Sequence, residues 1–339
     1  MVNAQQTKAE KAELPPADGQ PSRVRLFIVN YGVVVFLGLL IVGFSLALPG
    51  LFPTVGNVQV ILGGQAVAAL LALAVILPLV AGEFDLSAGA TLGFCAVVSA
   101  YLSASGMNVG LTLAITLAVA VFIGVLNGLI VTVIGVGAFI ATLGMATILA
   151  GGNLLLTNGT LITDIPRSMT VLGQSTLAGI PVIVFYVIVL ALVLYYMLEW
   201  TPAGRYFRAT GSGRDAARLT GIRTQRWLFA SFVIAAAIAG FAGFILTARL
   251  GSASPTVGPE FLLPAYAAAF LGATTIKPGR FNVWGTMVGV LVLAVGISGL
   301  NLGGAPFWVP QVFNGGALLL AVSVSVWVAK QKKAAASSV

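Results

Sequence analysis

The 339-residue chain has no histidine and a single cysteine, and each scarcity removes a class of function. Without histidine there is no Ser-His or Cys-His nucleophilic pair. The one thiol, Cys95, forms no disulfide within the chain and builds no Cys/His metal site. The sequence also has no Gly-x-x-x-x-Gly-Lys-Ser/Thr phosphate-binding loop. We therefore expect no enzymatic activity, no ATPase site and no bound cofactor or metal in this chain.

Charge is equally scarce. Charged residues make up 8% of the chain, hydrophobic residues make up 59%, and the mean hydropathy is +1.05. A soluble domain carries about 25% charged residues, so a soluble core of this length could not hide so much apolar surface. Apolar runs of about 20 residues are expected to be helices, because a bilayer cannot satisfy exposed backbone groups. The predicted fold class is an all-α, multi-pass membrane protein.

Ten apolar runs predict ten transmembrane helices with both termini on one side. The runs are 27–48, 58–80, 88–104, 111–134, 138–156, 180–199, 229–249, 262–276, 282–301 and 310–329. Residues 1–26 are polar and Pro-containing, and are expected to be a disordered cytoplasmic tail. Residues 27–329 then form the transmembrane domain, and residues 330–339 form a basic cytoplasmic tail.

The basic residues predict the orientation. With both termini in the cytoplasm, 15 of the 17 Lys and Arg residues lie inside, and only Arg167 and Arg249 lie outside. Such a bias is typical of cytoplasmic loops. The sequence pI of about 9.9 therefore indicates membrane topology rather than binding to nucleic acid.

One segment, 201–226, connects two apolar runs and holds six of the basic residues. They are Arg205, Arg208, Arg214, Arg218, Arg223 and Arg226. One interpretation is a topology signal alone. The other is a docking element for a cytoplasmic protein, because glycines flank a short helical run from Asp215 to Leu219.

The order of residues in this segment favours docking. Gly204-Arg205 is followed by Ala209 and Gly211, and then by the run Ala216-Ala217-Arg218-Leu219-Thr220-Gly221-Ile222. This order resembles the coupling segment of sugar-type ABC importer permeases, the ribose and xylose permease group. The resemblance implies that eight residues couple the chain to an ATPase. They are Arg205, Gly211, Arg214, Ala216, Ala217, Arg218, Gly221 and Ile222.

A second segment, 81–93, places the carboxylates of Glu83 and Asp85 between apolar runs. Ionisable residues at a membrane edge are costly and indicate function. Alternatively, Asp85 or Ser87 is the N-cap of the next helix, where such side chains are favoured. The run Gly82-Glu83-Phe84-Asp85-Leu86-Ser87-Ala88-Gly89 resembles the Gly-Gly-x-Asp-Leu-Ser-x-Gly motif of the ribose group, with Glu83 in place of the second glycine.

The second half of the chain has a similar Gly-rich break. Gly-x-x-x-Gly pairs follow both breaks, at 89–93 and at 285–289. Paired interruptions predict an inverted repeat, with halves 58–156 and 229–329. Ordinary close packing of helices is the alternative explanation of the glycine pairs.

Uncharged polar residues inside the apolar runs are candidates for a translocation path. With Asp85 and Ser87, they are Asn127, Thr142, Asn153 and Asn301. Scattered hydroxyls and amides suit a neutral polyol better than an ion. The alternative for each residue is a hydrogen bond between helices.

The resemblance implies the transmembrane subunit of a bacterial inner-membrane ABC importer for a neutral monosaccharide. Its partners would be the lipid bilayer, a second permease copy or paralogue, a cytoplasmic ATPase that binds ATP and Mg, and a periplasmic sugar-binding protein. A branched-chain amino acid permease is the closest alternative, although the runs show no paired charges to meet an amino acid. An ion-coupled secondary transporter would need buried acids, and only Glu83 and Asp85 qualify.

Overall fold

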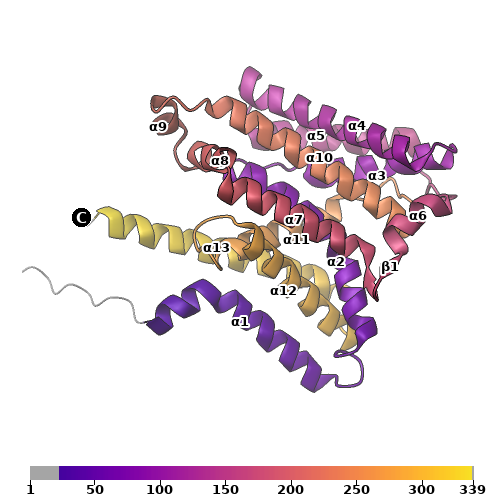
Figure 1. Cartoon of the computed structure of the whole chain (residues 1–339), viewed down its shortest axis with the longest axis horizontal. Coiled ribbons are helices and arrows are strands. Elements are labelled where there is room, and N and C mark those ends of the chain that lie inside the picture. Colours follow the sequence, from indigo (N-terminus) through magenta and orange to yellow (C-terminus); the bar gives the residue numbers. More distant parts are fainter. Residues whose placement is uncertain (1–22, 338–339) are drawn as a thin grey trace, which may run out of the picture.

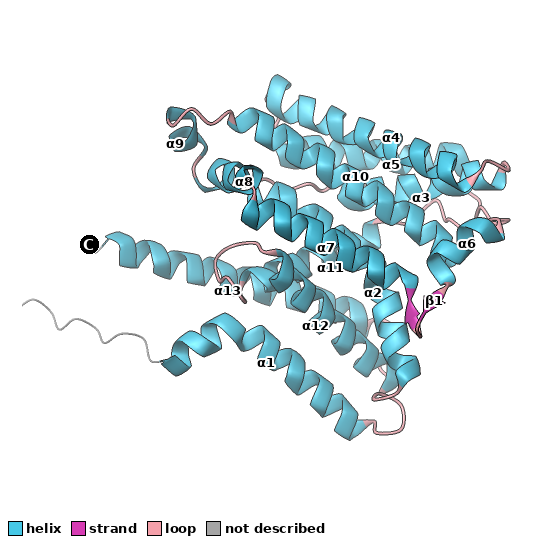
Figure 2. Ribbon diagram, in the orientation of Figure 1, coloured by secondary structure: helices cyan, strands magenta, loops and turns pink. Residues whose placement is uncertain are grey.

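The computed structural model is almost entirely helical (Figures 1 and 2), and it describes residues 23–337, with side chains for residues 30–323. The helices are α1 Arg23–Ala47, α2 Val55–Val80, α3 Ala88–Ala104, α4 Val109–Leu129 with a π-helical turn Ile130–Ile134, α5 Ala138–Thr157, α6 Arg167–Gln174, α7 Val182–Trp200, α8 Pro202–Ser212, α9 Arg214–Leu219, α10 Thr224–Leu250, α11 Pro259–Ala273, α12 Val283–Leu302 and α13 Val309–Ser337. A short antiparallel pair is formed by β1 Thr176–Leu177 and β2 Ile180–Pro181.

Each of the ten predicted apolar runs coincides with one helix. Within the described residues, seven helices are long and apolar enough to cross a membrane: α1, α2, α4 with its π-helical turn, α5, α7, α10 and α12. The apolar helices α3, α11 and the described side-chain part of α13 are shorter. The all-helical, multi-pass class is confirmed, and the count of ten spans stays a prediction.

Both predicted tails overlap helices, α1 over residues 23–26 and α13 over residues 330–337. Helix α1 begins at Arg23, inside the predicted tail 1–26, and α13 continues to Ser337. The predicted disorder of residues 1–22 and the last two residues of the basic tail lie outside the described residues.

The core of the molecule is built around α2 and α10. Residues 66–81 of α2 and its C-cap are buried almost without interruption, and α10 packs against α2, α3 and α4 (Figure 1). Small residues allow these close approaches. A Cβ on Gly124 would lie 2.8 Å from the carbonyl oxygen of Phe232 on α10, and one on Gly243 would collide with the carbonyl oxygen of Leu92.

The irregular segment 251–258, between α10 and α11, lies against the glycines of α3. A Cβ on Gly89 would lie 3.1 Å from the carbonyl oxygen of Gly258, and one on Gly93 would collide with that of Val257. Gly285 and Gly289 similarly meet the backbone of α11. The Gly-x-x-x-Gly pairs therefore act as close-packing sites, as the packing alternative predicts.

The molecule has two ends that carry different connections (Figure 1). Helices α8 and α9 and the C-terminal end of α13 lie at one end, whereas α6 and the β1–β2 pair lie at the other. The 201–226 segment, which holds six arginines, lies at the first end, and Arg167 begins α6 at the second. This separation agrees with the charge bias on which the predicted orientation rests.

Candidate functional site

The turn between α2 and α3, residues 81–87, is shaped by a glycine. Gly82 has a φ of 86°, a left-handed conformation that side chains disfavour. It ends α2 in a Schellman arrangement, in which the amide of Glu83 donates to the carbonyl of Pro78 (2.9 Å) and that of Gly82 to Leu79 (3.1 Å). After this turn Glu83 is half-buried, whereas Asp85 is buried.

Asp85 does not cap α3 directly. Its carboxylate Oδ1 accepts hydrogen bonds from the amide (3.0 Å) and the hydroxyl (2.6 Å) of Ser87, and the Asp85 side chain is buried. Ser87 occupies the N-cap position of α3, yet its side chain makes no cap hydrogen bond. The predicted cap is thus replaced by a carboxylate that orders the N-cap residue.

Four of the predicted path residues meet at this turn. Asn127 of α4 donates from Nδ2 to Ser87 Oγ (2.8 Å), and Thr142 Oγ1 of α5 accepts from the amide of Leu86 (3.0 Å). Tyr266 of α11 joins them, since its hydroxyl accepts from the Asp85 amide (2.9 Å) and donates to the Asp85 carbonyl (3.0 Å). We call this group the Asp85 cluster; its members are Asp85, Ser87, Asn127, Thr142 and Tyr266.

The other two predicted path residues lie apart from the Asp85 cluster. Asn153 is about three turns along α5 from Thr142 and is buried. It lines a cavity of about 250 Å³ with parts of α3 and the 251–258 and α11 region, and its Oδ1 has no hydrogen-bond partner among the described residues. Asn301 is exposed near the end of α12.

Helix α8 packs directly on the end of α2 through another glycine. A Cβ on Gly211 would collide with the carbonyl oxygen of Val80. A Cβ on Gly82 would in turn lie 3.0 Å from Gly211 Cα, so the two glycines face each other. Beside this contact, Arg214 of α9 donates to the carboxylate of Glu83 at 2.9 Å. Arg214 and Gly211, both predicted to couple to an ATPase, therefore also bind the α2–α3 turn.

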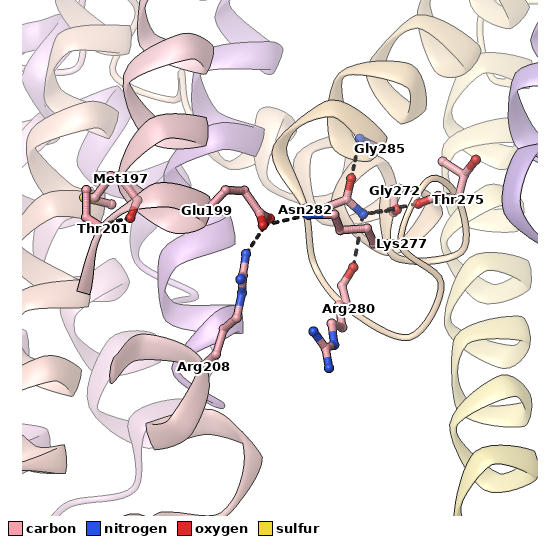
Figure 3. Close-up of polar contacts among 10 residues, drawn as sticks. All are labelled: Met197, Glu199, Thr201, Arg208, Gly272, Thr275, Lys277, Arg280, Asn282 and Gly285. Carbon is pink, nitrogen blue, oxygen red and sulfur yellow. Dashed lines mark hydrogen bonds and ion pairs between the residues drawn. The ribbon is translucent and has the colours of Figure 1, made fainter. Parts of the chain in front are cut away.

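A second ion cluster holds α8 through Arg208 (Figure 3). Glu199, in the last turn of α7, accepts from Arg208 of α8 and, at 2.7 Å, from Lys277 in the loop between α11 and α12. Asn282 orders that loop: its Oδ1 accepts from the Gly285 amide (2.7 Å) and its Nδ2 donates to carbonyls that include Gly272 (3.0 Å). The predicted site did not include Tyr266, Glu199 or Lys277. Of these three, Glu199 alone had a signal in the sequence, because it is an isolated charge at the end of an apolar run.

Helix α9 presents an apolar side chain outward. Leu219 is 91% exposed and Ala216 is also exposed, whereas Ala217 is buried within the chain (7% exposed). Gly221, with a φ of 84°, and Ile222 follow α9 and line a pocket of about 560 Å³ next to Arg223 and Arg226.

The arginines of the segment divide into two groups. Arg208 and Arg214 make the ion pairs described above, and Arg218 lies 3.7 Å from Asp215 in an exposed pair. Among the described residues, Arg205, Arg223 and Arg226 have no carboxylate within ion-pair distance. The α8–α9 end therefore combines unpaired positive charge with one exposed leucine.

Known proteins resemble this chain over most of its length. The profile of the family described as "Branched-chain amino acid transport system / permease component" matches residues 57–322. The ribose import permease protein RbsC of Bacillus subtilis (strain 168) is 35% identical over 268 residues, which cover 78% of this chain and 83% of that protein. The D-allose transport system permease protein AlsC of Escherichia coli (strain K12) is 28% identical over 315 residues, 93% and 97% of the two chains. No solved structure matches the chain.

Proposed function

Because the chain belongs to the branched-chain amino acid transport system / permease component family, we propose that it forms the translocation path of an ATP-driven importer for a neutral monosaccharide. The extent of the match to permeases named for ribose and D-allose carries this proposal, since it spans most of the chain in both cases. The importer would lie in the bacterial inner membrane, with the α8–α9 end in the cytoplasm.

The polar groups of the candidate path suit a sugar. The cavity beside Asn153 is otherwise lined by Ala, Leu, Pro, Val and Thr, so it offers an amide and a hydroxyl but no charge. Hydroxyl groups of a sugar can pair with an amide oxygen that is otherwise unsatisfied. A free amino acid would need groups that meet both its ammonium and its carboxylate, and this cavity supplies neither.

The α8–α9 end suits an ATPase partner. Leu219 would enter an apolar depression on that partner, and Arg205, Arg223 and Arg226 would meet its acidic groups. ATP and Mg are bound by the partner, which supplies the chemistry of hydrolysis. The chain itself contributes the docking surface, the helices that change position and the polar lining of the path. A second permease copy or paralogue completes the path, and a binding protein delivers the sugar.

Reconstitution tests this proposal. The full chain is placed in liposomes with its cognate ATPase and binding protein, and uptake of D-ribose, D-allose and L-leucine is measured with and without ATP. We expect ATP-dependent uptake of a sugar and none of leucine. Uptake of leucine alone would favour the amino acid permease, and uptake that needs a proton gradient instead of ATP would overturn the importer.

A further inference from the structure

We propose that α8 is a two-point lever that moves the α2–α3 turn and the α11–α12 loop together, and that Glu83, Arg214 and Glu199 are the positioning residues of this lever. The proposal rests on the proposed function, because it states how motion imposed on α8 and α9 by an ATPase reaches the path.

The first point joins α8 to the α2–α3 turn. Gly211 and Gly82 bring two backbones into contact, and Arg214 binds Glu83 at 2.9 Å. The Glu83 and Arg214 side chains are 26% and 33% exposed, so solvent screens this pair less than it screens the Arg218–Asp215 pair, whose side chains are 48% and 96% exposed. A shift of helix α8 toward α2 therefore displaces the turn.

The second point joins α8 to the α11–α12 loop. The carboxylate of Glu199 lies between Arg208 and Lys277 (Figure 3), and its side chain is only 15% exposed. The loop behind Lys277 is held by Asn282, which bonds to backbone groups of Gly272, Thr275, Arg280 and Gly285. A loop tied in this way moves as one body with its anchor.

The two points belong to one closed circuit of contacts. From α8 it runs to the α2–α3 turn, where Asp85 follows Glu83 by two residues. The Asp85 backbone binds the Tyr266 hydroxyl on α11 through both its amide and its carbonyl. Helix α11 ends at the α11–α12 loop, and Lys277 of this loop binds Glu199. Glu199 also binds Arg208 of α8, which closes the circuit. The Asp85 cluster lies on this circuit, so movement of α8 reaches Asn127 and Thr142 as well.

Charge reversal separates a lever from a mere stabilising contact. The full chain, reconstituted with its ATPase and binding protein, is compared as wild type, Glu83→Arg, Arg214→Glu and the double variant, with ATP hydrolysed per D-ribose imported as the readout. Each single variant is expected to raise this ratio at least fivefold, and the double variant to return it to within twofold of wild type. Arg167→Glu, a reversal at the exposed start of α6, is the control and should leave the ratio unchanged.

A second readout does not require transport. A Phe84→Cys variant in a Cys95→Ala background is treated with a maleimide, with and without ATP and vanadate. We expect an ATP-dependent change in labelling that each single reversal abolishes and the double reversal restores. If the wild type imports no D-ribose but shows this pattern, the lever stands and the sugar assignment fails. Single variants with a wild-type ratio and wild-type labelling, or a double variant no better than the singles, would overturn the lever.

Discussion

The hydroxyl of Tyr266 on α11 closes two hydrogen bonds with one residue, since it accepts from the amide of Asp85 at 2.9 Å and donates to the carbonyl of Asp85 at 3.0 Å. Both backbone groups belong to a buried residue in a non-helical turn. Without the hydroxyl, the buried amide of Asp85 loses this partner, which is costly, whereas the Asp85 carbonyl still accepts from the amide of Ala88 (3.4 Å).

Tyr266→Phe is therefore expected to destabilise the chain. A buried group left without a partner costs about 1–3 kcal/mol, and the amide of Asp85 is the group left unpaired, so the loss should be of that size if the turn does not rearrange. Thermal unfolding in detergent measures it, with Tyr101→Phe, an exposed tyrosine at the end of α3, as the control. Equal melting temperatures for both variants would show that the Tyr266 hydroxyl holds nothing in place.

Substitutions of Asp85 separate its geometry from its charge. Asn can still accept from the Ser87 amide and hydroxyl, so Asp85→Asn should reach the membrane at normal abundance. Asp85→Ala leaves the two Ser87 donors without this acceptor, which costs about 1–3 kcal/mol and lowers abundance. We expect Asp85→Asn to import sugar more slowly per molecule. Sugar uptake is divided by the abundance of each variant on immunoblots. Wild-type values for both variants would show that the Asp85 carboxylate serves packing and not transport.

Leu219→Asp is expected to break the docking surface without disturbing the chain. The side chain is 91% exposed, so the change places no charge inside the protein, but it sets a carboxylate against the apolar depression of the partner. A tenfold weaker complex corresponds to about 1.4 kcal/mol, and co-purification of the ATPase should fall by at least that factor. Leu177→Asp, at an exposed position in β1, is the control. Unchanged co-purification would remove α9 from the interface.

Ala217→Asp makes the opposite kind of change at a neighbouring position. Ala217 is buried within the chain, so a carboxylate there is taken from water without a partner. We expect lower abundance in the membrane as well as lost docking, whereas Leu219→Asp should lose docking alone. Immunoblots of membrane fractions check the difference, and normal abundance of Ala217→Asp would show that α9 turns another face to the chain.

Asn153→Leu tests the cavity beside α5. It removes an amide whose oxygen has no partner within the described chain and leaves Thr256 as the polar residue of the lining, so a sugar loses one hydrogen-bonding group. We expect the sugar concentration for half-maximal uptake to rise several-fold, since a hydrogen bond contributes about 1 kcal/mol. Thr112→Val, which changes another buried unpaired polar group away from this cavity, serves as the control. Identical uptake curves for the two variants would exclude Asn153 from the path.

The fold was largely predictable because long apolar runs in a sequence predict membrane helices. All ten runs became helices, including the 15-residue α11. Asp85, Ser87, Asn127 and Thr142 could be picked out as candidates because polar residues are few in these runs, but their meeting could not, since Asn153 from the same set lies apart with an oxygen unpaired among the described residues. Their actual bonds were not predictable, because they join the α2–α3 turn to α4 and α5 across large sequence separations.

Other parts of the site had no pattern in the sequence from which they could be predicted. Tyr266 lies in an apolar run, where a tyrosine is indistinguishable from a core aromatic until its hydroxyl partner is known. The outward face of α9 was equally hidden, because six residues are too few to show a helical period. Leu219 and Ala217 therefore read alike in the sequence, although one is exposed and the other is buried.

The facing glycines at 82 and 211 give the α8 contact a directional character. With no side chain on either backbone, there is no rotamer to adjust, so a push from α8 toward α2 passes through hard atomic contact without slack. A pull in the reverse direction is carried in this joint by the attraction between Glu83 and Arg214. Dissolved salt weakens attraction between charges and leaves steric repulsion untouched. Motion of α8 toward α2 therefore depends on steric contact, and motion away from α2 depends on the ion pair. Ionic strength is expected to affect only the second motion.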